Sequence, residues 1–253
     1  MLKRILITND DGIYADGIRA LAEAMKTIGE VYVVAPESEQ SAVGHGITVR
    51  RPLRFKPTHA DRFEGMSAYR VDGTPADCVA LGVRLLPHPD ILVSGINMGQ
   101  NLGDDLTHSG TISAAIEGIH QGIPSIAFSH VFPPKGEDFD FSYGAQYAVK
   151  LVQFVLKHGL PDRTLLSVNF PFGQPKGVRA TSLSNHDYKD NILERTDPNG
   201  EKYYWVDGTP GGDGHPENDL GAVQEGYISV TPVKLDFLNR DFVQDLQPQL
   251  PQV

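Results

Sequence analysis

Two hydrophobic periods alternate along the first half of the chain, and this alternation restricts the fold more than any other feature. Residues 4–8 form a β-branched strand pattern, and the next segment places Ile18, Leu21 and Met25 on one face of a helix. Later segments repeat the alternation, with strand patterns at 31–35, 91–95 and 125–128 and helical patterns at 79–86 and 112–119. Such units form a parallel sheet between helical layers. We expect an α/β fold, Rossmann-like and doubly wound, with a mostly parallel sheet.

The second half of the chain has a looser pattern, which predicts a β-rich extension of the same sheet. We expect a helix at 143–156 and strands at 165–170 and 227–235, while segments 47–55 and 69–71 are candidates for an antiparallel pair beside the sheet. Residues 1–130 then form an α/β core that holds the functional site. Residues 131–253 complete the sheet and close with the C-terminal strand.

A polar stretch at about 185–225 contains a hairpin signal. Asn199 and Gly200 stand between two strand-like flanks, which predicts a tight turn and a projecting arm. Tyr203, Tyr204 and Trp205 cannot be buried inside an isolated hairpin. We expect the arm to join subunits in a homodimer or homotetramer; the alternative is a surface loop.

Charge and cysteine usage limit the partners of the chain. Its formal net charge of −10 disfavours a nucleic-acid polymer, and a small phosphorylated substrate would need a bound cation to offset the repulsion. The single cysteine, Cys78, excludes an internal disulfide and fits a reducing compartment. The apolar run near the N-terminus is too short for a signal peptide, and no segment has the roughly 18 apolar residues of a membrane span. We expect a cytoplasmic protein without a membrane partner.

Polar side chains follow three of the expected strands, at the edge where doubly wound sheets bind ligands. Asp10 and Asp11 follow the first strand, and Gly12 permits a turn that brings both carboxylates toward one point. Ser41 follows the second strand and Asn97 ends a later one. Two carboxylates so close repel each other unless a cation lies between them, and this all-oxygen set suits Mg²⁺ or Mn²⁺ better than zinc or copper. An ordinary turn with solvated acids is the alternative.

The loop after Asn97 leads through Asn101 to Ser109, Gly110 and Thr111, directly ahead of a predicted helix. A helix N-terminus presents unpaired N–H groups, and a glycine there lets an anion approach the backbone, so this turn is a candidate phosphate site. Ser109 or Thr111 could equally be a simple helix cap.

Five blocks of sequence, in this order, resemble the SurE family of survival proteins: ITNDDG, EQSAVGHGIT, GTPADCVALG, VSGINMGQNLG and SGTISAAIEG. The resemblance covers most of the first 130 residues. It implies a metal-dependent nucleoside monophosphate phosphatase, active on various nucleotides and on polyphosphate. It also implies that Asp10, Asp11, Ser41 and Asn97 bind the metal, whereas Asn101 and the turn at Ser109, Gly110 and Thr111 hold the phosphate.

The sequence leaves several mechanistic choices open. A metal-activated water or a carboxylate of Asp10 or Asp11 could attack phosphorus, and His108 or His45 could protonate the leaving group. Cys78 and Arg84 have the spacing of cysteine phosphatases, but a helix that begins at Thr74 would place Cys78 within it. A dinucleotide-binding module would need glycines where Asp10 and Asp11 stand. Non-catalytic nucleotide binding and an oligomeric scaffold are the remaining alternatives.

Overall fold

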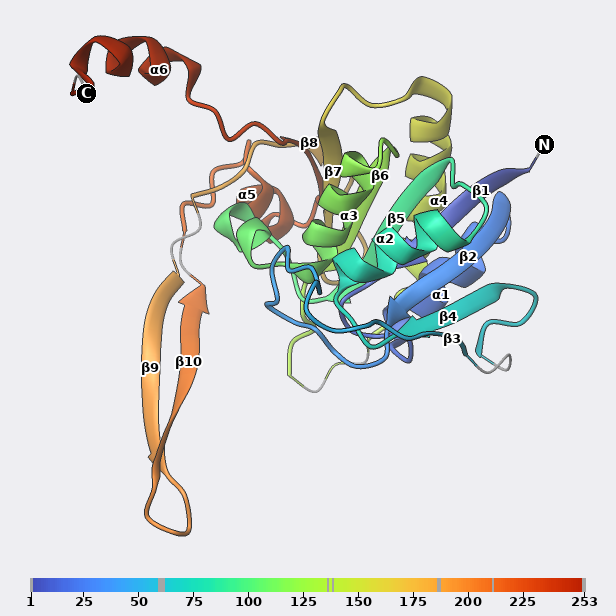
Figure 1. The fold of residues 1–253 in the computed structure, drawn as a ribbon, viewed down its shortest axis with the longest axis horizontal. Coiled ribbons are helices and arrows are strands. Elements are labelled where there is room, and N and C mark those ends of the chain that lie inside the picture. Colours follow the sequence, from blue (N-terminus) through green and yellow to red (C-terminus); the bar gives the residue numbers. More distant parts are fainter. Residues whose placement is uncertain are drawn as a thin grey trace.

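The computed structural model describes residues 2–58, 62–135, 137, 139–185, 188–210 and 212–251. A nine-stranded sheet has the order β3-β4-β2-β1-β5-β6-β7-β11-β8, and β9 and β10 form a separate two-stranded sheet (Figure 1). The strands of the large sheet are β1 (Lys3–Thr8), β2 (Gly29–Pro36), β3 (Phe55–Pro57), β4 (Ser67–Val71), β5 (Ile91–Met98), β6 (Ser125–His130), β7 (Thr164–Phe170), β8 (Val178–Ala180) and β11 (Ile228–Lys234). The helices are α1 (Asp16–Met25), α2 (Pro75–Leu85), α3 (Gly110–His120), α4 (Ser142–His158), α5 (Asp219–Gln224) and α6 (Arg240–Leu246), with short 3-10 helices η2 (Gly103–Thr107) and η3 (Gln247–Gln249).

The sheet is doubly wound around β1. Strand β1 pairs in parallel with β2 on one side and with β5 on the other. Helices α1 and α4 pack together over one face, where Leu21 and Val152 share a hydrophobic cluster; α2 and α3 cover the other face, where Val79 and Ala114 share a second cluster. The direction of winding therefore reverses between β1 and β5, and doubly wound folds bind ligands at such a point. The predicted fold class is confirmed.

Helix α2 begins at the predicted residue. Thr74 is its N-cap and Pro75 its first residue, and the Thr74 hydroxyl accepts a hydrogen bond from the Asp77 amide while the Asp77 carboxylate accepts one from the Thr74 amide. Cys78 therefore lies inside the first turn, where its amide donates to the Thr74 carbonyl. The Cys78 amide is used in the helix and is therefore not available to bind a phosphate, as the loop of a cysteine phosphatase requires.

The predicted antiparallel pair beside the sheet is only partly correct. Strand β4 does pair antiparallel with β3, but β4 also pairs in parallel with β2 and so belongs to the main sheet. Residues 47–54 contain no strand, because β3 begins only at Phe55. The segment 47–54 instead belongs to the long connection that leaves β2, and the Thr48 amide ties it to α2 by donating to the Asp77 carboxylate at 2.9 Å.

The second half completes the sheet with a reversal of direction. Strand β7 is parallel to β6, whereas β11 returns antiparallel to β7, and β8 lies parallel at the outer edge. The predicted helix at 143–156 is α4, and the predicted strands at 165–170 and 227–235 are β7 and β11. The final strand does not close the chain as predicted, since α6 and η3 follow it. In the described part of the chain no helix combines the length and the apolarity needed to cross a membrane.

The predicted hairpin is present and projects away from the sheet (Figure 1). Strands β9 (Tyr188–Thr196) and β10 (Lys202–Pro210) are antiparallel and are joined by a turn in which Gly200 has a φ of +91°. The Asp197 carboxylate holds the turn by accepting hydrogen bonds from the amides of Asn199 and Glu201. The boundary of the arm was predicted too far along the chain, because residues 219–224 form α5, which packs on β11.

Candidate metal and phosphate site

The carboxyl ends of β1, β2 and β5 converge on one cavity. Its volume is about 590 Å³, and its lining includes Asp10, Ser41, Asn97, Asn101 and Ser109. The loop after β2 is fixed to the end of β1, because the Gln40 amide donates to the Asp10 carbonyl at 2.7 Å. Residues that are far apart in sequence are thus brought together at the predicted edge of the sheet.

The turn after β1 has the shape that the sequence predicts. Gly12 has a φ of +95°, a conformation that strongly favours glycine. The buried Asn9 side chain stabilises the turn by donating to the Gly12 carbonyl at 3.0 Å. A Cβ atom at Gly12 would lie 3.3 Å from the carbonyl carbon of Ser38, so the turn also packs closely against the loop that carries Ser41. Asp10 and Asp11 therefore follow the strand in a turn that is held on two sides.

Asp10 is buried against the N-terminus of α3. Its Oδ1 accepts a hydrogen bond of 2.5 Å from the Thr111 hydroxyl. A Cβ atom at Gly110 would lie only 2.6 Å from the Asp10 Cβ, so glycine permits this close packing. Burial raises the pKa of Asp10, although the Thr111 hydroxyl and the amides of Thr111 and Gly110 act in the opposite direction. The positive end of α3 thus faces a ligand candidate.

The Asp11 carboxylate has a longer hydrogen bond than that of Asp10. Burial, then the charge of Asp10 and that of Glu39 raise its pKa to about 7, while the Met98 amide, 3.4 Å away, opposes the rise. Among the described residues, no lysine, arginine or histidine forms an ion pair with Asp10 or Asp11. Two adjacent carboxylates without a positive partner fit a bound cation.

Ser41 and Asn97 complete an all-oxygen set at the cavity. The exposed Ser41 hydroxyl donates to Glu39 at 2.7 Å, which leaves its lone pairs available. Asn97 uses its amide nitrogen to donate to the Gly99 carbonyl at 2.8 Å, so its Oδ1 is the atom that can accept a cation. Carboxylate, hydroxyl and amide oxygens are the ligands of a hard cation, and the donor chemistry fits Mg²⁺ or Mn²⁺.

Asn101 is fixed by a residue that the sequence analysis missed. Asn169, at the end of β7, accepts from the Asn101 amide and donates to the Asn101 carbonyl, both at 2.9 Å. The Asn101 side chain donates to the Ser129 hydroxyl at 2.7 Å. Asn169 also stands at the carboxyl end of a predicted strand, and that position is the signal that could have identified it.

Two residues of the turn ahead of α3, Ser109 and Thr111, use their hydroxyl groups differently. Ser109 is the N-cap, since its hydroxyl accepts from the Ile112 amide at 3.2 Å, and the capping interpretation is confirmed for this residue. Thr111 does not line the cavity, and its hydroxyl is used on Asp10. Phosphate binding by Ser109, Gly110 and Thr111 stays a prediction.

Comparisons with known proteins identify the family of this chain. The family model described as "Survival protein SurE" matches residues 5–190. The chain belongs to the SurE family. It is 56% identical over 250 residues to "5'-nucleotidase SurE 1" of Thermus thermophilus, with 99% of each chain covered. It is also 56% identical over 250 residues to "5'-nucleotidase SurE" of Deinococcus radiodurans, covering 98% of this chain and 93% of the relative.

A solved structure shows the same fold. The crystal structure of the SurE protein from Aquifex aeolicus superimposes with a TM-score of 0.83 at 40% sequence identity, and the match covers 97% of this chain and 99% of the other. The projecting hairpin and the sheet extension therefore lie within the matched length. The resemblance noted in the first 130 residues thus extends to almost the whole chain.

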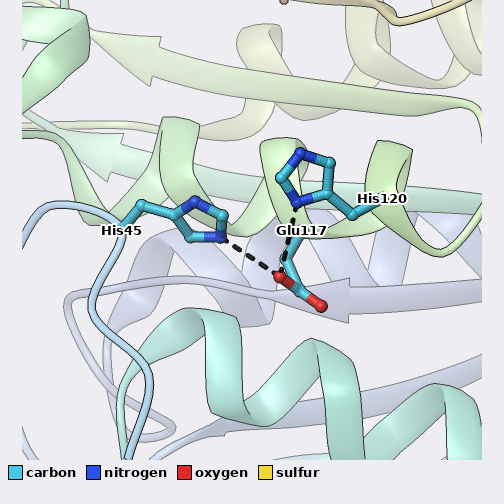
Figure 2. Close-up of side chains that lie close together, drawn as sticks. All are labelled: His45, Glu117 and His120. Carbon is cyan, nitrogen blue, oxygen red and sulfur yellow. Dashed lines mark hydrogen bonds and ion pairs between the residues drawn. The ribbon is translucent and has the colours of Figure 1, made fainter. Parts of the chain in front are cut away.

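The structure of this SurE-family chain distinguishes among the other candidate catalytic residues, which are Cys78, His108 and His45. Cys78 is fully buried in α2, and desolvation raises the pKa of its thiol well above the ordinary value, so it is not a nucleophile. His108 lines the cavity and remains a candidate acid. His45 instead directs its ring toward Glu117, at 3.1 Å, and does not line the cavity (Figure 2).

Proposed function

We propose that this SurE-family protein is a divalent-metal-dependent phosphomonoesterase that hydrolyses nucleoside 5′-monophosphates to nucleoside and phosphate. The observation that carries the proposal is the pair of adjacent carboxylates, Asp10 and Asp11, beside a cavity of about 590 Å³. The names of the relatives from Thermus thermophilus and Deinococcus radiodurans, both 5'-nucleotidases, support the same reaction.

Four side chains would hold the cation: Asp10, Asp11, Ser41 and Asn97. A bound Mg²⁺ or Mn²⁺ supplies positive charge for the phosphoryl oxygens and lowers the pKa of a coordinated water. The chain contributes the arrangement of these side chains. Thr111 fixes the carboxylate of Asp10, and the Gln40 amide ties the loop of Ser41 to the same strand end.

The phosphate group would lie between Asn101 and the start of α3. The start of α3 is the positive end of the helix, which stabilises an anion beside the Asp10 carboxylate that the amides of Gly110 and Thr111 already face. Asn101 is held rigidly by Asn169 and Ser129, so its side chain is preorganised at the cavity wall. Rigid donors stabilise the charge that develops on equatorial oxygens without reorganising during the reaction.

The side chains at the cavity offer two attacking groups and one proton donor. Either a water molecule or a carboxylate oxygen of Asp10 or Asp11 forms the new bond to phosphorus while the bond to the ester oxygen breaks. Incorporation of oxygen-18 from water into a carboxylate would identify the carboxylate route. His108 can donate a proton to the leaving alkoxide. His108→Ala should then slow nucleotide hydrolysis far more than that of p-nitrophenyl phosphate, whose leaving group needs no proton.

The cavity wall supports a broad choice of nucleotide. Phe132 is 58% exposed and Met98 is 42% exposed, and both line the cavity. An aromatic ring and a thioether can pack against any base through its π-face, without hydrogen bonds that select one base. We include 3′-monophosphates and short polyphosphate among the substrates to be tested.

The hairpin and the C-terminal segment would join copies of this chain into a homodimer or homotetramer. Trp205 is 62% exposed on β10, and Phe237, after β11, is 91% exposed. Such surfaces are normally covered in an assembly. Trp205→Asp should shift the mass measured by light scattering toward the monomer, whereas an unchanged mass would contradict this assignment. The unpaired thiol of Cys78 favours a cytoplasmic location.

The direct test is phosphate release from a nucleotide panel in Mg²⁺, Mn²⁺ or excess EDTA, with Asp11→Asn beside the wild type. We expect hydrolysis with either metal and loss of hydrolysis in EDTA and in the variant. Persistence in chelator would contradict metal dependence. Binding of nucleotide with no phosphate release under any condition would favour the non-catalytic alternatives, a nucleotide-binding protein or an oligomeric scaffold.

A further inference from the structure

A second group of potential metal ligands lies away from the cavity, at the opposite end of α3. It consists of His45, Glu117 and His120, whose ligand atoms all lie within 4.8 Å of one another. Glu117 and His120 come from α3, and His45 comes from the loop after β2 (Figure 2). We propose that this cluster binds a transition-metal ion of the Zn²⁺ class, independently of the Mg²⁺ or Mn²⁺ site.

The carboxylate at the centre of the cluster is buried and already oriented. The Glu117 side chain is only 7% exposed, and its Oε1 accepts a hydrogen bond of 2.8 Å from Gln121. Its Oε2 faces both imidazoles, with His45 Nε2 at 3.1 Å and His120 Nδ1 at 3.9 Å. A ligating carboxylate typically has such an outer hydrogen bond on one oxygen while the other binds the metal.

The cation partners of Glu117 are imidazoles alone in the part of the chain that the structure describes. Its ion pairs there are with His45 and His120, and no lysine or arginine is among them. Imidazoles, which are common metal ligands, are therefore the groups that face the oxygen that a metal would bind.

The spacing and the donor types indicate which metals fit. Glu117 and His120 are three positions apart on one helix, so they lie on the same face. Two imidazoles and one carboxylate form a three-ligand set that suits zinc and leaves a fourth position for water. The set differs from the all-oxygen set at Asp10, which suits a harder ion. The 3.1 and 3.9 Å separations approach those of neighbouring ligands in a tetrahedron, and the 42% exposed His120 can rotate to close the site.

The backbone around His45 is anchored on both sides. The Gly44 amide donates to the His108 carbonyl at 2.9 Å, and the Gly46 carbonyl accepts from the Thr74 hydroxyl at 2.7 Å. His45 is thus presented to α3 by a short segment with fixed ends. A metal held between His45 and Glu117 would fasten the loop that carries Ser41 to the helix that begins at Gly110. The second site would then stabilise the framework of the first.

The first experiment measures zinc binding to the full-length protein by isothermal titration and by metal analysis after dialysis. Asp11→Asn removes a ligand of the hard-cation site, and in that background we expect about one zinc ion per chain. Adding His120→Gln should abolish this binding, whereas His88→Ala, a change at an exposed histidine outside the cluster, should leave it intact. Equal binding with and without His120→Gln would overturn the proposal, as would no binding in the Asp11→Asn background.

A second measurement separates ligation from a structural effect of the substitution. His120→Gln removes an imidazole that lies 3.9 Å from Glu117, beyond hydrogen-bond distance, so the melting temperature without metal should stay close to that of the wild type. Zinc should raise the melting temperature of the Asp11→Asn protein and not that of Asp11→Asn with His120→Gln. It should also slow hydrogen exchange in residues 43–47. In the same Asp11→Asn background, Co²⁺ should show the visible absorption of a tetrahedral site with imidazole ligands; an octahedral spectrum would contradict the geometry.

Discussion

At its N-terminus α3 contacts Asp10, whereas near its C-terminus it carries Glu117, and the two carboxylates have opposite pKa shifts. Burial dominates at Asp10 and its neighbour Asp11, and their pKa values rise. Burial also acts to raise the pKa of Glu117, yet hydrogen bonds from His45 and Gln121, together with the charges of His45 and His120, lower it. Burial alone therefore does not decide the charge of a carboxylate; its partners do.

This difference indicates what each region still lacks. The charges of Asp10 and Glu39 both raise the pKa of Asp11, so the metal-free protein has a like-charge repulsion at the strand ends that a hard cation would offset. The Glu117 carboxylate already has hydrogen bonds with His45 and Gln121. A metal would replace the contact with His45, and it would not relieve a repulsion. The first site should depend strongly on its metal, while the second should tolerate the absence of one.

The largest expected effect comes from removing one charge at the strand ends. Asp10→Asn should lower kcat/KM for a nucleoside 5′-monophosphate by about a thousandfold, since the charge stabilisation that a catalytic metal supplies amounts to several kcal/mol. The matched control is Asp90→Asn, at the other end of β5, where Asp90 accepts hydrogen bonds from Lys3 and the Arg4 amide. The control should retain activity within about twofold. Similar losses in both variants would mean that Asp10 acts only through the fold.

The close packing of α3 on Asp10 gives the next effect. Gly110→Ala would place a Cβ atom 2.6 Å from the Asp10 Cβ, so either the carboxylate or the helix must move. A displacement of about 1 Å at a reacting centre can cost on the order of a hundredfold in rate. Steady-state kinetics with saturating Mn²⁺ measure this loss. Full activity of Gly110→Ala would show that the turn ahead of α3 does not need to touch the acid pair.

A smaller effect is expected from the hydroxyl that orients Asp10. Thr111→Val keeps the size of the side chain but removes the hydrogen bond to Asp10, and outer hydrogen bonds of this kind contribute about tenfold or more to metal affinity. Thr111→Ser keeps the hydroxyl and should bind Mn²⁺ nearly as well as the wild type. Titration of Mn²⁺ by electron paramagnetic resonance distinguishes them. Equal affinities of the valine and serine variants would contradict an orienting role.

The local chemistry of the strand ends could be read from the sequence, because it depends on short segments. The run of Asn9, Asp10, Asp11 and Gly12 directly after an apolar strand defines both the turn and the acid pair, and Thr74 with Pro75 defines the start of α2. Long-range placement could not be read in the same way. Asn169 holds Asn101 only because β7 lies next to β6, and that neighbour relation depends on the order of the strands in the sheet.

The cluster at the far end of α3 shows the same limit. The spacing of Glu117 and His120 is visible in the sequence. His45 joins them because the loop after β2 passes beside α3, and no local pattern predicts that approach. Helix α6 was missed for a different reason. None of its residues is buried in this chain, so the hydrophobic periodicity that identifies core helices is weak there.

The smallest predicted effect is on the stability of the metal-free protein. Neutralising Asp11 should raise the melting temperature, whereas neutralising Glu117 should lower it. Asp11 has a folded-state pKa of about 7, above its ordinary value, so its charge destabilises the metal-free fold as the pH rises through that range. Asp11→Asn should therefore raise the melting temperature in EDTA at about pH 8 by roughly 3 °C, and by less at about pH 5, where the carboxyl group of the folded protein is already protonated.

Glu117 has a lowered pKa, so its charge stabilises the fold above its unfolded-state pKa. Glu117→Gln should therefore lower the melting temperature at about pH 8 by a similar amount. Calorimetry of the two variants in chelator measures both melting temperatures. Shifts of the same sign would contradict opposite pKa shifts of Asp11 and Glu117.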